Sequence, residues 1–204
     1  MKAYTSNNIR NIAVLGHGGK GKTTLCEAML YIAGASDRLG RVADGNTVLD
    51  FDSEEKRRKS SVSSAIAALE WDNTKLNIID APGLFDFEGG AAEAVRAAEA
   101  VLIVTSAGSG VDVGTEKAFR AAEKKGAAKF FAVTKTDSDH RNFYKTFDAL
   151  KEVYGNKLCP TIIPYMEGNI TKCYVNLMTG MAFSYDENGK ATKVPVPEDS
   201  VIEE

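Results

Sequence analysis

Apolar and polar positions in the first part of the chain predict a strand, a glycine-rich turn and a helix. Residues 11–15 form a short apolar run that glycines close, and apolar residues recur at helical spacing from residue 22 onward. Residues 36–64 are mostly polar, and a connection of that length is typical of a functional or mobile loop. Residues 62–71 and 76–79 are strand-like and are joined by a short Asp-Asn-Thr turn, which predicts an antiparallel edge to the sheet.

Helical and strand-like segments then alternate along the chain. The expected order is a helix over 90–98, a strand over 101–104, a helix over 113–125, a strand over 130–133 and a helix over 141–154. This alternation predicts an α/β fold, with a mostly parallel sheet and helices on both of its faces. After residue 156, short apolar runs and an Asn188-Gly189 turn signal indicate a small strand-rich unit. We therefore expect a first domain over residues 1–157 and the beginning of a second unit over 158–204.

Composition narrows the classes of protein to which the chain can belong. Its 204 residues carry a formal net charge of −3, which argues against a DNA-binding protein that holds nucleic acid by bulk electrostatics. The three cysteines are far apart and lack the spacing of metal ligands, so we expect neither disulfides nor a zinc site. No apolar run has the length of a membrane span, and a cytoplasmic protein without a membrane partner is expected.

The turn after the first strand carries the strongest chemical signal. Residues 16–23 read Gly-His-Gly-Gly-Lys-Gly-Lys-Thr and match the phosphate-loop pattern, in its proper place between a strand and a helix. Glycines let backbone N–H groups surround a phosphate, the lysine reaches the β- and γ-phosphates, and the threonine hydroxyl binds Mg²⁺. The expected phosphate-binding residues are Gly16, His17, Gly18, Gly19, Lys20, Gly21, Lys22, Thr23 and Thr24. The fold class is thereby a P-loop NTPase.

Two further motifs follow at the ends of predicted strands. Asp80-Ala-Pro-Gly83 ends one strand, where a carboxylate can hold Mg²⁺ and the glycine N–H can approach the γ-phosphate. Thr134-Lys135-Thr-Asp137 ends another strand and resembles the Asn-Lys-x-Asp base-reading motif of GTPases, with threonine in the first place. The carboxylate of Asp137 can accept hydrogen bonds from guanine N1–H and its amino group, whereas adenine would leave that charge unpaired. The lysine stem would cover the base, so GTP or GDP is the expected ligand.

The order of these motifs resembles the translational GTPases, in particular elongation factor G-like proteins. The resemblance covers nearly the whole chain and implies that bound GTP orders two switch loops, here roughly residues 44–64 and 80–90. It also implies that the ribosome, as partner of the presumed full-length protein, triggers hydrolysis during translocation, and that the protein acts as a monomer. The tail looks like the start of the subdomain that the family inserts, and we expect the chain to be a fragment that lacks the last elements of its G domain.

Departures from the family pattern limit what the resemblance transfers. Leu84 stands where the family has the histidine that orients the attacking water, so no catalytic residue is assigned. The switch element Arg-Gly-Ile-Thr corresponds to residues 58–61, Arg-Lys-Ser-Ser, in which Ser61 could supply the hydroxyl that senses Mg²⁺. Gly19 replaces a usual aspartate, and no Ser-Ala base-supporting motif follows Asp137. The basic run 56–59 could meet ribosomal RNA or offer an arginine to the γ-phosphate, although such a run is usually solvated.

Two other functions stay open on the sequence alone. A deviant P-loop ATPase is one, since residues 17–24 resemble the Lys-Gly-Gly-x-Gly-Lys-Thr-Thr loop of that class, but His17 replaces its signature lysine. The other is a hydrolysis-deficient module in which guanine nucleotide only fixes a conformation, an idea that Leu84 supports.

Overall fold

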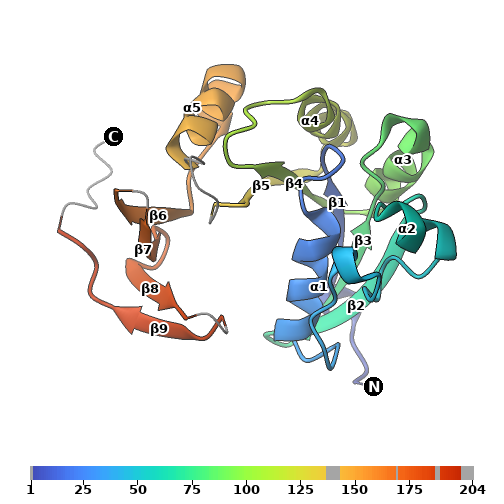
Figure 1. Cartoon of the computed structure of the whole chain (residues 1–204), viewed down its shortest axis with the longest axis horizontal. Helices are drawn as coiled ribbons and strands as arrows, with labels where there is room; N and C mark the ends of the chain where they lie inside the picture. Colours follow the sequence, from blue (N-terminus) through green and yellow to red (C-terminus); the bar gives the residue numbers. More distant parts are fainter. Residues whose placement is uncertain (1, 137–142, 169, 187–188, 199–204) are drawn as a thin grey trace.

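The chain folds into a five-stranded sheet covered by helices and a separate four-stranded sheet (Figure 1). The structure is a computed structural model that describes residues 2–136, 143–168, 170–186 and 189–198. The strands of the larger sheet, sheet A, are β1 (Ile9–Leu15), β2 (Ala65–Trp71), β3 (Thr74–Asp80), β4 (Ala100–Ser106) and β5 (Ala128–Thr134). They lie in the order β2-β3-β1-β4-β5, and only β2 runs antiparallel to its neighbour. The predicted α/β fold with an antiparallel edge is confirmed.

Alternation along the central strand explains why both faces of sheet A are covered. In β1, Ala13 and Leu15 point into one core and Val14 into the other, as the two-residue period of a strand requires. The first core holds α3 (Glu88–Ala97) and α4 (Val113–Lys125), and the second holds α1 (Lys22–Ile32). In the described residues no helix is both long and apolar enough to cross a membrane.

The polar segment between α1 and β2 is more ordered than its composition predicts. It contains short 3-10 turns at Val42–Asp44 and a helix, α2 (Ser53–Arg58). A capping box begins α2: the Asp52 side chain accepts from the backbone N–H of Glu54, and the Glu55 carboxylate accepts from the backbone N–H of Asp52 at 3.2 Å. The Asp-x-x-Glu spacing that signals this cap is present in the sequence, whereas the prediction for this segment is a functional or mobile loop without a helix.

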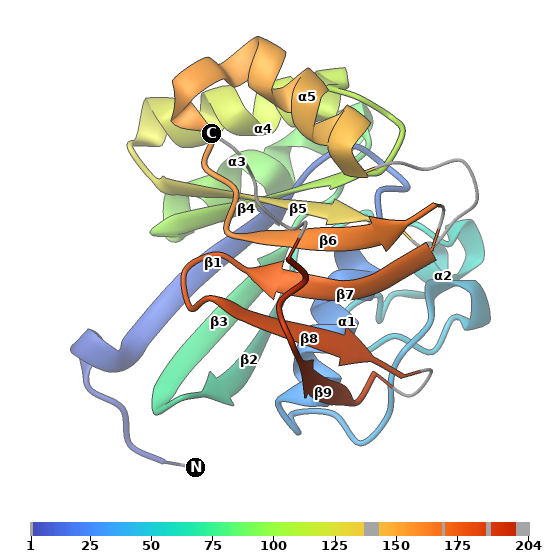
Figure 2. The same ribbon diagram turned by 90° about the vertical axis from the view of Figure 1, so that its left-hand side faces the viewer.

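The second sheet, sheet B, is antiparallel and is linked to sheet A through one helix (Figure 2). Its strands are β6 (Ile162–Glu167), β7 (Ile170–Asn176), β8 (Met181–Tyr185) and β9 (Ala191–Val194). The linking helix is α5 (Phe143–Tyr154), followed by a short 3-10 turn at Gly155–Lys157. The Thr146 hydroxyl accepts from Gly108 N at 2.9 Å on the sheet A side, and the Tyr144 hydroxyl donates to Pro164 O at 2.7 Å on the other. The strand-rich tail is as expected, Asn188 of its predicted turn lies outside the described residues, and a domain boundary at residue 157 stays a prediction.

Candidate nucleotide-binding site

Parallel pairing brings the sequence motifs to one edge of sheet A. Strands β1, β3, β4 and β5 run in the same direction, so the loops after them meet at their carboxyl ends, where open α/β sheets bind ligands. The loop after β1 needs its glycines for two reasons. Gly16 has φ 140° and a Cβ there would lie 2.2 Å from Val104 O, while Gly21 has φ 86° and directly precedes α1.

Lys22 is buried beneath this loop. Its Nζ donates to Gly16 O and His17 O, both at 3.1 Å, which holds the ammonium group inside the curve of the loop. Burial lowers the pKa of Lys22, and the nearby Asp80 carboxylate opposes that shift. Gly83 packs against the Lys22 ammonium group, since a Cβ at position 83 would lie 2.2 Å from Lys22 Nζ. The loop that follows Asp80 therefore touches the phosphate loop, as the motif order led us to expect.

Hydroxyl and carboxylate groups gather beside Lys22. Thr23 Oγ1 donates to Asp80 Oδ2 at 2.6 Å and lies 3.2 Å from Ser61 Oγ, although Ser61 is 38 residues away in the sequence. Asp80 is buried, which raises its pKa to about 7, even though the Thr23 hydrogen bond and Lys22 oppose the shift. Its other oxygen, Oδ1, is buried without a hydrogen-bond partner in the described part of the chain.

The unpartnered Oδ1 atom of Asp80 is the observation that bears on whether a divalent cation fits this site. Oxygen ligands from hydroxyl and carboxylate groups suit Mg²⁺, which keeps waters and binds phosphate oxygens rather than sitting in an all-protein cage. Among the described residues there is no group of three or more His, Cys, Asp or Glu residues that could hold a metal. Thr23, Ser61 and Asp80 carry the oxygen atoms that could hold Mg²⁺ here together with phosphate, and that role stays a prediction.

Asp50 joins this cluster and was missed by sequence reasoning. It is 3% exposed, and its Oδ1 accepts from Ser61 Oγ at 2.7 Å. Thr47 donates to its other oxygen at 3.4 Å. Nothing in the local spacing distinguishes Asp50 from Asp44, which lies in the same polar segment, so only the fold identifies it.

The base-reading motif is attached to the phosphate loop from the far side. Thr134 Oγ1 lies 2.6 Å from Lys20 O and 3.1 Å from Thr105 O, and Lys135 Nζ donates to Gly19 O at 2.7 Å. The phosphate loop is also joined to the start of α4, because Lys20 Nζ forms an ion pair at 3.1 Å with Asp112, the N-cap of that helix. Asp137, the expected guanine-reading residue, lies outside the described residues, so its role stays a prediction.

Leu84 lies against the phosphate loop at the position of the family histidine. A Cβ at Gly18 would be 3.0 Å from Leu84 Cδ2, and the leucine side chain is partly exposed. The next residue, Phe85, makes an edge contact with the His17 ring, with centroids 5.5 Å apart. The Nδ1 atom of His17 is buried and has no hydrogen-bond partner within the described residues.

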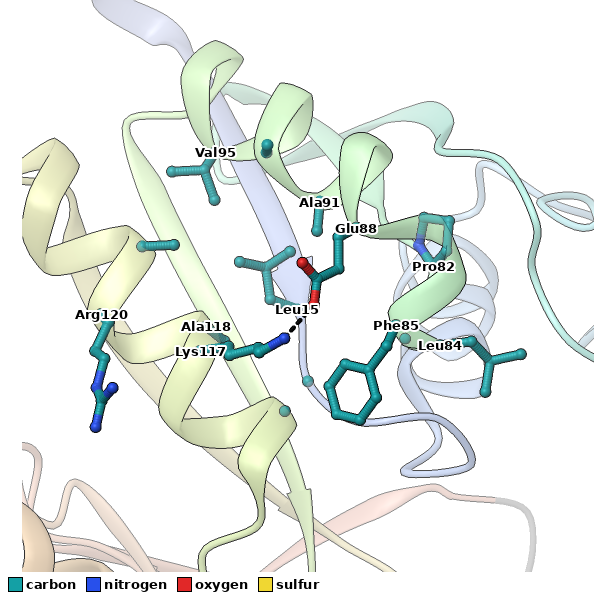
Figure 3. Close-up of a pocket in the computed structure, with 15 residues that line it drawn as sticks. Leu15, Pro82, Leu84, Phe85, Glu88, Ala91, Val95, Lys117, Ala118 and Arg120 are labelled. Carbon is teal, nitrogen blue, oxygen red and sulfur yellow. Dashed lines mark hydrogen bonds and ion pairs between the residues drawn. The ribbon is translucent and has the colours of Figure 1, made fainter.

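A second, apolar cavity lies behind Leu84 and Phe85 (Figure 3). It has a volume of about 360 Å³ and lies between α3 and α4. Small residues that line it, such as Ala91 of α3 and Ala118 of α4, leave this space unfilled. At its mouth Lys117 of α4 pairs with Glu88 and lies 4.4 Å above the Phe85 ring. These contacts connect the segment after Asp80 to α4.

The smaller crevice beside the phosphate loop has a volume of about 220 Å³ and is called the nucleotide crevice. It is lined by Gly18, Gly19, Gly21, Lys22, Thr23, Thr24, Val42, Asp50, Lys59, Ser60, Ser61, Gly83 and Lys135.

Comparison with known proteins decides the family. The elongation factor Tu GTP binding domain family matches residues 7–200 of the chain. This chain belongs to that family. Membership accounts for the phosphate loop and for the sheet order, and it favours a guanine nucleotide over the deviant ATPase hypothesis.

Relatives within the family are elongation factor G-like. The elongation factor G-like protein of Mycobacterium tuberculosis strain H37Rv is 33% identical over 94% of this chain and 26% of its own length. The protein of that name from Synechocystis sp. PCC 6803 is 30% identical over 97% of the chain and 29% of its own length, and elongation factor G of Mycoplasma genitalium is 30% identical over 95% and 28%.

A solved structure agrees with the fold. A crystal structure of a protein from Thermus thermophilus superposes with a TM-score of 0.88 at 37% identity, covering 94% of this chain and 28% of that one. The chain therefore spans little more than a quarter of the relatives it matches.

Proposed function

We propose that this chain binds GTP and GDP with Mg²⁺ as the G domain of an elongation factor G-like ribosomal translocation factor. The observation that carries the proposal is the contact between Thr23 and Asp80, with a buried and unpartnered Asp80 oxygen beside it. A nucleotide-bound Mg²⁺ would supply the missing charge there. Family membership supports the guanine nucleotide, and the relatives' names, elongation factor G and elongation factor G-like protein, support a role in translation elongation.

Each part of the site has a proposed task. Backbone N–H groups of residues 16–24 and the Lys22 ammonium bind the phosphates, and Gly83 approaches the terminal phosphate. Thr23, Ser61 and Asp80 hold Mg²⁺, with Asp50 orienting the Ser61 hydroxyl. Lys135 covers the base and Asp137 selects guanine. The ion supplies charge neutralisation for the phosphates when bound.

Leu84 is the residue of the site that should limit the rate of GTP hydrolysis. A leucine has no hydrogen-bonding atom, so it cannot orient an attacking water as the family histidine does. Its packing on Gly18 also places an apolar side chain beside the phosphate loop. We therefore propose GTP hydrolysis that is slow in the isolated chain. The same observation favours a second candidate function, a hydrolysis-deficient module that signals by its nucleotide state.

A titration of GDP and ADP with Mg²⁺ tests the binding proposal. GDP should bind at least about 100-fold more tightly than ADP, because adenine leaves the Asp137 carboxylate without donors. Lys22→Ala should weaken GDP binding strongly, and Lys125→Ala, on an exposed helix end, serves as its control. A clear preference for ADP would overturn the guanine assignment.

Turnover measurements with and without ribosomes test the hydrolysis proposal. Leu84→His should raise the rate of GTP hydrolysis by roughly 10²-fold or more, the usual contribution of a positioned polar group. Leu84→Met, which keeps an apolar side chain of similar volume, should leave the rate unchanged. Rapid hydrolysis by the unmodified chain would contradict the inference that position 84 limits it, and no turnover even on ribosomes would favour the hydrolysis-deficient module.

A further inference from the structure

The basic run at the end of α2 divides into two parts in the structure. Arg57 and Arg58 both pair with the Glu54 carboxylate on the surface of the helix, and both arginine side chains are exposed. The hypothesis that an arginine of this run reaches the nucleotide therefore has no geometric support. Lys59, the last residue of the run, behaves differently.

Lys59 is held in an unusual backbone conformation. It caps α2 with φ 53° and ψ 40°, and its N–H donates to Glu55 O. This left-handed region favours glycine, and a residue with a long side chain is strained there by about 1 kcal/mol. The family resemblance places a glycine at this position. A strained residue that replaces glycine beside a ligand crevice is a reason to look for a function of its side chain.

Lys59 lies at the edge of the nucleotide crevice and is exposed. The residue lines that crevice together with Lys22, Thr23 and Ser61. The ammonium groups of Lys22 and Lys135 donate to carbonyl oxygens of the phosphate loop. In contrast, the Lys59 ammonium has no hydrogen bond or ion pair with any described residue.

We propose that Lys59 is a phosphate-binding residue, whose ammonium group pairs with the terminal phosphate of a bound nucleoside triphosphate. The inference rests on the proposed function and adds a residue that the switch motif does not predict. Ser61, two residues later, lies beside Thr23, so this segment is close to the end of the site where the Mg²⁺ ligands gather. A diphosphate lacks the terminal group, so Lys59 favours GTP over GDP.

Binding of GDP and of a non-hydrolysable GTP analogue to matched variants tests this proposal. Lys59→Asn removes the charge but tolerates the left-handed backbone, so it should weaken analogue binding about 5- to 10-fold and change GDP binding by less than about twofold. Lys59→Arg should keep the preference for the analogue. Lys56→Asn, which removes the same charge from the same helix but does not line the crevice, should change neither affinity.

Thermal unfolding of the nucleotide-free protein gives an independent readout. Lys59→Gly relieves the backbone strain and should raise the unfolding temperature while it weakens analogue binding, so function and stability move in opposite directions. If Lys59→Asn weakened the binding of GDP and of the analogue equally, or weakened neither, the role of Lys59 would be overturned while the proposed function stands. Unchanged affinity for both ligands is also the result expected if Lys59 binds ribosomal RNA. Failure of the unmodified chain to bind either nucleotide would overturn the proposed function and this inference together.

Discussion

The hydroxyl group of Thr134 has a single proton to donate. Its Oγ1 atom lies 2.6 Å from Lys20 O, which accepts that hydrogen bond. The asparagine usual at this motif position has two amide protons, so it can serve a loop carbonyl and a base nitrogen at once. Once Thr134 donates to Lys20, it has no donor left for an acceptor such as N7 of a purine. We therefore expect Thr134 to anchor this segment to the phosphate loop and to leave N7 of a bound purine without a donor.

This single donor leads to a prediction about nucleotide analogues. GDP and 7-deaza-GDP, which lacks the N7 acceptor, should bind the unmodified chain with affinities within about twofold of each other. Thr134→Asn should introduce a preference for GDP of about 3- to 10-fold, the equivalent of one net hydrogen bond. Calorimetric titration of both ligands measures the effect, and a strong preference for GDP in the unmodified chain would show that Thr134 does donate to the base.

Asp80 should make stability depend on pH in an unusual direction. Its pKa rises on folding from 3.8 to about 7, so between these values the folded protein binds the extra proton. Stability from this group is complete below pH 3.8 and is lost as the pH rises through about 7, a change on the order of a few kcal/mol.

Chemical unfolding of the nucleotide-free protein at pH 5 and pH 8 checks this prediction. The free energy of unfolding should fall with pH more steeply in the unmodified protein than in Asp80→Asn, whose amide does not titrate in this range. Mg²⁺ with GDP needs the ionised carboxylate, so stabilisation by this ligand should grow with pH. Parallel pH profiles for the two proteins would contradict the raised pKa.

Among the elements, α2 shows how a polar segment becomes ordered. The buried Glu55 carboxylate accepts from the backbone N–H groups of Asp52, Val62 and Ser63, at 3.2, 2.9 and 3.0 Å. The buried Glu27 of α1 accepts from Val48 and Leu49 at the other end of the segment. Two buried carboxylates thus accept from backbone donors at both ends of the segment, and these bonds order the stretch that carries Ser61 to Thr23.

Removing one of these carboxylates should release the segment. Glu55→Ala leaves three backbone donors unsatisfied, and we expect it to lower the free energy of unfolding by about 2–3 kcal/mol. Amide hydrogen exchange should accelerate at Val62 and Ser63, and Mg²⁺ should bind more weakly because Ser61 is no longer held. Glu54→Ala, which removes only exposed ion pairs, should cost less than about 1 kcal/mol and leave exchange at Val62 unchanged.

At the scale of the whole molecule, sheet B is attached to sheet A through α5 and the small core around Phe143. That ring packs on the buried Ile163, Cys173, Val175 and Ala182. No residue of α5 or of sheet B lines the nucleotide crevice, within the parts of the chain that are described. Nucleotide binding and the anchoring of sheet B should therefore be separable.

Phe143→Ala tests this separation. It should weaken the packing of sheet B by about 2–3 kcal/mol and speed proteolysis between α5 and β6, while the affinity for GDP changes by less than about twofold. Val153→Ala, a truncation of an exposed residue on the same helix, should change neither property. A large loss of GDP affinity in Phe143→Ala would show that the two sheets are coupled.

Sequence patterns predicted those features that depend on contiguous residues. The phosphate loop, the strand that leads into it and the position of Asp80 at the end of β3 all follow from local spacing. The capping box of α2 was also readable, because Asp52 and Glu55 are three residues apart. In contrast, Asp50, Lys59 and the anchoring role of Thr134 were not predicted, since each is defined by partners far along the chain or by a backbone conformation.

The sequence by itself determined that a glycine-rich loop of the phosphate-binding pattern opens a helix and that a motif resembling the guanine-reading one follows a later strand, because glycine, lysine and strand periodicity act over a few residues. Only the tertiary structure decided which carboxylates lie beside Thr23 and Ser61, that Leu84 packs on the phosphate loop, and that Thr134 bonds to Lys20 114 residues away. The physical reason is that burial changes both the pKa of a carboxyl group and the hydrogen bonds open to a hydroxyl, and burial depends on segments that local sequence does not bring together.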